Sequence, residues 1–185
     1  AGMRALIDAD DAEWSLFVAT DHEEVGSAST VGAQGPMLMD ALAALAPDPK
    51  LNRMMRAQSW MMSVDNAHAT HPNYADRHDD QHSPRLGDGP VIKINRNQRY
   101  ATTGEGATRL RVLAERTEID LQTFVMRSDL ACGSTIGPIT ATETGIPTTD
   151  IGIPTLAMHS IRGLACAGDI PPLVALLNAF YRRVA

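Results

Sequence analysis

The sequence lacks several features that define whole classes of protein. Two cysteines, Cys132 and Cys166, are too few for a disulfide framework, which favours a reducing compartment and predicts a cytoplasmic location. The formal net charge is −6, whereas nucleic-acid-binding proteins usually carry a basic face. The apolar runs are too short to cross a bilayer, and the N-terminal stretch lacks the basic-then-apolar order of a secretory signal. We therefore expect neither nucleic acid nor membrane as a partner.

The sequence does contain an ordinary globular composition, 44% hydrophobic and 21% charged, with strand and helix patterns in alternation. This alternation predicts a layered α/β fold, and 185 residues suit one domain. The apolar, β-prone runs predict strands over 15–20, 59–64, 89–95 and 121–128, and an extended segment over 148–158 that Pro154 interrupts. Helical spacing, proline and glycine signals predict helices over 36–46, 105–117, 134–145 and 170–184.

Two acidic stretches directly follow predicted strands, where an open α/β sheet exposes its sites. The first, "TDHEEVGS", contains Glu23 and Glu24. Adjacent carboxylates point in different directions, so one can bind a cation while the other accepts a proton from water on that cation; a solvated surface pair is the alternative. The second, "SVDNAH", delivers Asp65 from an apolar strand, either to a metal ion or as the N-cap of a following helix.

Histidines supply a second kind of candidate ligand. His159 lies among apolar residues in "LAMHSIR", either as a hydrogen-bonded core residue or as a metal ligand. Together with Glu24 and Asp65 it forms an oxygen-and-nitrogen set suited to zinc or manganese, although the large sequence separations prove nothing. We expect His68 to face the site. The remaining histidines of the 63–82 segment are expected at the loop surface or at subunit contacts: His71, His78 and His82.

A cationic residue in an apolar run is the third unusual feature. Lys93 is flanked by isoleucines in "VIKIN", either as the charge that protects an edge strand or as a positive group in a pocket. Arg99 and Tyr100 follow in "NQRYAT" and are both able to bind an anion or an oxyanion.

Five motifs together resemble the aspartyl aminopeptidase family of dinuclear-metal exopeptidases. They are "DHEEVGS", "SVDNAHATHPNYADRH", "GPVIKINRNQRYAT", "MRSDLACGSTIGPI" and "DIGIPTLAMHSIR", in that order between Asp21 and Arg162. The resemblance implies an αβα sandwich with a central mixed sheet. It also implies a metal-dependent aminopeptidase that removes N-terminal Asp or Glu from peptides and assembles as a homo-oligomer, a dodecamer.

The resemblance further implies roles for individual residues. Glu23 is similar to the general base, and Glu24, Asp65 and His159 to ligands of two divalent ions, zinc in the first place, with manganese and cobalt as alternatives. Lys93 is similar to the residue that recognises the acidic side chain of the substrate. Tyr100 and His68 match positions near the substrate.

The chain also departs from the family pattern. Family members carry two further ligands upstream of the glutamate pair, a histidine in an HxD motif and a bridging aspartate followed by Asn, and neither has a counterpart here. We therefore expect residues 1–185 to be the C-terminal portion of one catalytic domain, without the N-terminal portion and the inserted dimerisation domain, and inactive alone. A truncated, incompetent homologue that serves as an assembly subunit, and a two-metal aminopeptidase of different specificity, are the alternatives.

Overall fold

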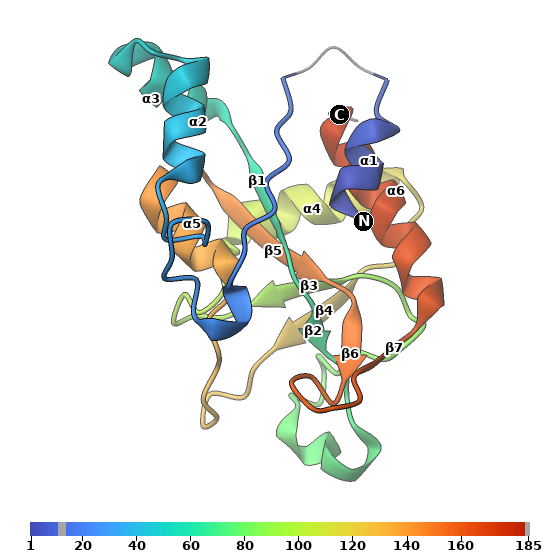
Figure 1. Ribbon diagram of the computed structural model, residues 1–185. Coiled ribbons are helices and arrows are strands. Elements are labelled where there is room, and N and C mark those ends of the chain that lie inside the picture. The colour runs from blue at the N-terminus through green and yellow to red at the C-terminus, as the bar shows by residue number, and fades with distance from the viewer. Residues whose placement is uncertain (11–13, 184–185) are drawn as a thin grey trace.

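The computed structural model describes residues 1–10 and 14–183, which form a central four-stranded sheet between layers of helices (Figure 1). The strand order is β1 (Met61–Val64), β5 (Thr148–Gly152), β3 (Val91–Ile94) and β4 (Gln122–Val125). β1 is parallel to β5 and β3 is parallel to β4, whereas β5 and β3 run antiparallel. The sheet is therefore mixed, as predicted.

Alternating residues of the central strands face two different helical layers. On one face, Ile92 and Ile151 pack with α4 (Gly104–Arg116) and α6 (Ile170–Tyr181), and α1 (Gly2–Ile7) packs on α6. On the other face, Asp150 lies against α5 (Ile136–Thr144). The main core lies on the first face and contains Leu110, Leu113, Leu173, Leu176 and Leu177.

A second, smaller sheet continues from two strands of the first. β2 (Ala67–His68) comes after β1 and is parallel to β6 (Pro154–Leu156), which comes after β5; β7 (Leu164–Ala165) is antiparallel to β6. The two sheets meet where Asp65 passes Gly152, and a Cβ on Gly152 would lie 1.7 Å from the Asp65 carbonyl oxygen. Only glycine permits this contact, which brings Asp65 to the end of the central sheet.

The four predicted helices are present, and the structure adds two α-helices that were not predicted, α1 and α3. α2 (Met37–Leu45) and α3 (Pro49–Gln58) lie next to each other at one end of the molecule (Figure 1). The start signal of α3 was available in the sequence, because Asp48 caps the Lys50 and Leu51 amides and Pro49 comes directly after the cap. Val184, the last residue of the predicted terminal helix, lies outside the described residues. No helix in the described residues has the length and apolarity that a membrane span requires.

The strand predicted over 15–20 is wrong. This segment has no strand partner among the described residues, and β1 remains the edge of the central sheet. Its apolar side chains are only partly covered, since Leu16 is 46% exposed and Phe17 and Val18 are half-buried. A β-prone run becomes a strand only where a neighbouring strand pairs with its backbone. The "DHEE" stretch is therefore carried by short helices and turns.

The packing of α4 predicts which of its apolar side chains contribute to stability. Leu110 is fully buried in α4, so Leu110→Ala should lower the free energy of unfolding by about 3 kcal/mol, measured by urea denaturation. Val112 lies on the solvent side of the same helix and is 41% exposed, so Val112→Ala should change stability by no more than about 0.5 kcal/mol. Equal losses in the two variants would contradict the packing described here.

Candidate active site

A tight turn presents the two adjacent glutamates. Glu23 and Glu24 open the 3-10 helix η1 (Glu23–Val25), and His22 before it has a left-handed backbone with φ 59°. The His22 carbonyl accepts hydrogen bonds from the amides of Val25 and Ser27, at 3.3 and 2.8 Å. The His22 Nδ1 atom lies 2.8 Å from the Ser29 hydroxyl oxygen. These contacts hold the turn in place without help from a strand.

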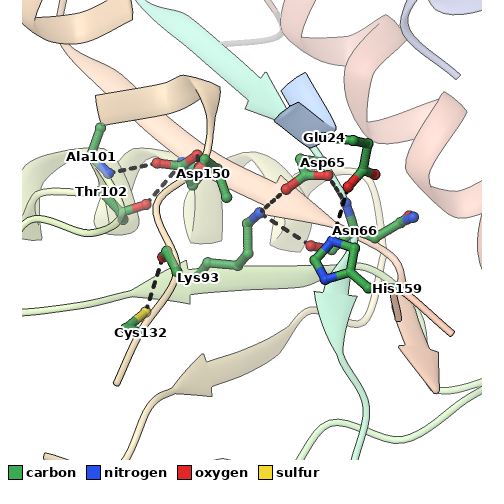
Figure 2. Close-up of polar contacts among 11 residues, drawn as sticks. Glu24, Asp65, Asn66, Lys93, Ala101, Thr102, Cys132, Asp150 and His159 are labelled. Atoms are coloured by element: carbon green, nitrogen blue, oxygen red, sulfur yellow. Dashed lines mark hydrogen bonds and ion pairs between the residues drawn. The ribbon is translucent and has the colours of Figure 1, made fainter. Parts of the chain in front are cut away.

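The turn brings Glu24 to His159. The Glu24 Oε2 and His159 Nε2 atoms are 2.9 Å apart, although 135 positions separate the residues in the chain (Figure 2). His159 comes after β6 and also has a left-handed backbone, with φ 65°. Its side chain is 69% exposed, so the alternative of a core histidine is wrong. Uncommon backbone conformations, at His22 before the glutamates and at His159 itself, thus support the pair.

Asp65 and Lys93 form the buried side of the site. The Lys93 ammonium lies 3.3 Å from Asp65 Oδ2 and 3.2 Å from the Asn66 carbonyl oxygen (Figure 2). The Lys93 side chain is 1% exposed, and β3 has neighbours on both sides, so the edge-strand alternative is wrong. Asp65 precedes the strand β2, so it is not the N-cap of a helix.

The charges at this end of the sheet influence one another. Burial raises the pKa of Glu23, and the carboxylates of Asp65 and Glu24 raise it further, while Lys93 and His159 oppose the shift. A glutamate with a raised pKa among two other acids, an ammonium and an imidazole is typical of an acid–base site.

Tyr100 and His68 line the same region. The Lys93 ammonium lies 5.1 Å from the centre of the Tyr100 ring, within the range of a cation–π contact. Burial raises the pKa of Tyr100, and the nearby Cys132 adds to the shift. Burial also lowers the pKa of His68, and the positive charges of His78 and Lys93 lower it further. The structure therefore places all seven predicted site residues at one end of the central sheet.

Residues outside that set divide into surface and interior groups. His71 caps the 3-10 helix η2 (Pro72–Arg77), and His82 pairs with Asp79 at 2.6 Å, both on the loop. The surface position expected for His78 is wrong, because its ring packs against Phe124 and both ring nitrogens are buried. Asn66 and Asp150 were missed by sequence reasoning. Asn66 contributes its backbone, which no side-chain signal reveals. Asp150 gave a signal, because an acid inside the apolar run "TTDIGIP" requires partners.

The donors around Glu24 suit a divalent cation but do not enclose one. Glu24 and His159 offer an oxygen and a nitrogen side by side, a combination that zinc accepts. Asp65 lies beside them, but its Oδ2 atom is bonded to Lys93. Within residues 1–10 and 14–183, no three His, Cys, Asp or Glu side chains are grouped closely enough to hold a metal ion. The described residues alone therefore do not complete a metal site.

Comparison with known proteins decides the family. Residues 1–181 match the family described as aminopeptidase I zinc metalloprotease (M18). The chain belongs to the M18 family. It is 55% identical over 181 residues to the "probable M18 family aminopeptidase 2" of Azotobacter vinelandii, covering 98% of this chain and 42% of that protein. The chain therefore spans less than half the length of the curated relatives it matches. The resemblance drawn from the five motifs is confirmed.

Solved M18 structures have the same fold. A structure of the Ape4 and Nbr1 complex matches with a TM-score of 0.86 and 40% identity, over 90% of this chain and 32% of that chain. The mApe1 dodecamer of S. cerevisiae matches with a TM-score of 0.75 and 29% identity, over 89% of this chain and 38% of that chain. The mixed α/β architecture is thus shared with M18 aminopeptidases.

Two half-buried histidines, His68 and His78, predict how stability depends on pH. Burial lowers the pKa of both His68 and His78, so the unfolded chain binds more protons than the folded chain as pH falls below about 6.5. The free energy of unfolding should therefore decrease as the pH falls from about 7.5 to 5.5, until both histidines are protonated in the folded state as well.

Urea denaturation across this pH range measures the effect. His78→Phe removes one of the two groups, and its stability should fall less steeply with acidification. The matched control is His71→Gln, at the loop surface. Parallel curves for the native chain and His78→Phe would contradict the assignment.

Proposed function

We propose that this chain carries the substrate-binding residues and the general base of a metal-dependent aminopeptidase. This enzyme removes N-terminal Asp or Glu from peptides. One observation supports the proposal above others: Glu24 and His159 meet at 2.9 Å beside Glu23, while a buried ammonium is bonded to Asp65 on the inner side. A metal site, a proton acceptor and a cation for an acidic side chain are the three parts that such a reaction requires.

Glu23 is the proton acceptor in this proposal. Its carboxylate accepts a proton from the attacking water and donates it to the amine that leaves when the peptide bond breaks. The raised pKa suits this exchange, because a base works best when its pKa approaches the operating pH. Glu24 points elsewhere, toward His159, which leaves Glu23 free for the proton (Figure 2).

Glu24 and His159 would hold a zinc ion, and Asp65 would contribute to a second ion if it exchanged its bond with Lys93. When bound, zinc polarises a carbonyl group and makes water more acidic. We propose two ions, with manganese and cobalt as alternatives to zinc. The remaining ligands would come from the part of the longer relatives that lies outside the match.

Lys93 is the proposed recognition group for the acidic substrate. Its ammonium is removed from water, so attraction to a carboxylate is stronger there than at the surface. Tyr100 covers one side of the ammonium, and His68, whose lowered pKa favours the neutral form, lies nearby. A substrate with a neutral side chain would leave the cation without a new partner.

Assembly completes the proposal. Because the S. cerevisiae mApe1 structure is a dodecamer, we propose a homo-oligomer, as large as a dodecamer, as the working form. A cytoplasmic location stays a prediction from the low cysteine content.

A second function is favoured by the incomplete donor set. With no three potential ligands grouped in the described residues, the chain alone would bind zinc weakly and could serve as a non-catalytic subunit of an assembly. Zinc content after purification separates the two: stoichiometric zinc with turnover of an N-terminal-Asp peptide supports the peptidase, and a zinc-poor oligomer without turnover supports the subunit.

Glu23→Gln tests the base. In the zinc-loaded assembly, kcat on an N-terminal-Asp chromogenic peptide should fall by about 10²–10⁴, because the amide cannot accept the proton. Zinc content, measured by atomic absorption, should not change, since Glu24 and His159 remain. Glu143→Gln, an exposed glutamate on α5, is the matched control and should retain activity. A Glu23→Gln enzyme with activity within about threefold of the parent would remove Glu23 from the mechanism.

Lys93→Met tests specificity. The variant keeps the length of the side chain and removes the charge, so the ratio of kcat/KM for N-terminal-Asp over N-terminal-Leu peptides should fall by about a hundredfold. Loss of the Asp65 contact would lower the activity on both peptides by the same factor. The ratio of the two kcat/KM values therefore isolates the effect on specificity. Arg96→Met, an exposed cation just after β3, should leave the ratio unchanged. An unchanged ratio in Lys93→Met would show that another group binds the acidic side chain of the substrate.

A further inference from the structure

One carboxylate outside the proposed set of site residues is fully buried in the central sheet. Asp150 in β5 is 0% exposed. Its Oδ2 atom accepts a hydrogen bond from the Ala101 amide at 2.6 Å, and its Oδ1 atom accepts one from the Thr135 hydroxyl at 3.1 Å. Its own amide donates to the Thr102 hydroxyl oxygen at 2.9 Å. One residue thus bonds to the segment after β3 and to the segment before α5 (Figure 2).

The contact with α5 is close as well as polar. A Cβ on Gly137, in the first turn of α5, would lie 2.2 Å from Asp150 Oδ1. The backbone of the helix therefore rests directly on the carboxylate, at the helix end where a negative charge is stabilised. This position is specific for a carboxylate, because both of its oxygens accept from donors and an amide has only one oxygen.

The two segments that Asp150 connects carry side chains of the site. Tyr100, next to Ala101, covers the Lys93 ammonium at 5.1 Å. Cys132, three residues before Thr135, packs against the buried cluster that contains Tyr100. Arg99 closes the arrangement by donating from Nε to the Cys132 carbonyl oxygen at 2.9 Å. Displacement of either segment would uncover Tyr100 and widen the space around Lys93.

Another buried carboxylate shows what a purely architectural role looks like. Asp169 is also 0% exposed, and it accepts hydrogen bonds from the amides of Gly87 and Gly89, both at 2.9 Å. It joins the loop before β3 to the start of α6, and neither segment contains a proposed site residue. Asp150 and Asp169 are therefore equally buried and similarly hydrogen-bonded, so Asp169 serves as a matched control.

We propose that Asp150 is a positioning residue that sets the shape of the substrate pocket by holding Tyr100 against Lys93 and the Cys132–Thr135 segment against Tyr100. The assignment of a pocket there rests on the proposed function, whereas the positioning itself concerns the fold of this chain. Asp150 touches no substrate in this role. It acts through Tyr100 and Cys132.

The Cys132 thiol reports the positioning without requiring turnover. In a Cys166→Ser background, Cys132 is the remaining cysteine, and its rate of labelling by iodoacetamide is measured by mass spectrometry without denaturant at a pH of about 7.5. Asp150→Asn should accelerate labelling at least tenfold, because the released segment exposes the thiol. Asp169→Asn should leave the rate within twofold, even if it lowers the melting temperature as much.

Acceleration in Asp150→Asn alone supports the proposal. Equal rates in Asp150→Asn and the parent, or equal acceleration in both variants, would overturn it. If Asp150→Asn does not fold, Thr135→Val, which removes one bond to the same carboxylate, decides the question: about threefold faster labelling supports the proposal, and no change overturns it. The labelling result can be interpreted even if the peptidase proposal is wrong, because labelling requires no substrate.

Where the zinc-loaded assembly is active, the kinetics give a second reading. Asp150→Asn should raise KM for an N-terminal-Asp peptide about tenfold while kcat stays within threefold, because the pocket is disturbed and Glu23 is not. A fall in kcat with unchanged KM would overturn the positioning role at the pocket.

Discussion

The structure of the site depends on one buried ammonium. Lys93 lies in β3, an interior strand of the central sheet, with its side chain 1% exposed, and an unpaired charge there would cost several kcal/mol. Asp65, the Asn66 carbonyl and the face of Tyr100 compensate for it. The junction between the two sheets and the segment after β3 must therefore stay beside β3. The same constraint places Asp65 where Glu23 and the Glu24–His159 pair can approach it.

Secondary structure was predictable where the signal is local. Leu110 and Leu113 mark α4 by their spacing, Gly145 ends α5 with φ 69°, and Pro154 begins β6 just after β5 ends. The strand over 15–20 failed because pairing depends on a neighbour that the local sequence does not specify. The short strands β2, β6 and β7 also depend on contacts across the chain, which explains why periodicity revealed no second sheet.

The sequence identified the residues of the candidate site but not the contacts between them. Sequence reasoning selected Glu24, Asp65 and His159, but their meeting was expected from motif resemblance rather than from spacing. The alternatives left open for Asp65, Lys93 and His159 could be decided only by the folded chain: by the strand that comes after Asp65, by the two neighbours of β3, and by the exposure of the loop after β6. Asp150 escaped notice because its partners lie 15 and 49 positions away in the chain.

The central claim is that three distant segments form one side of a metal site. Zinc anomalous diffraction from crystals of this chain soaked in zinc tests it most directly. The account predicts an anomalous peak at about 2.0–2.2 Å from both a Glu24 carboxylate oxygen and a His159 ring nitrogen, on the side that faces Asp65. Zinc bound only elsewhere, or Glu24 and His159 held on separate faces of the molecule, would contradict it.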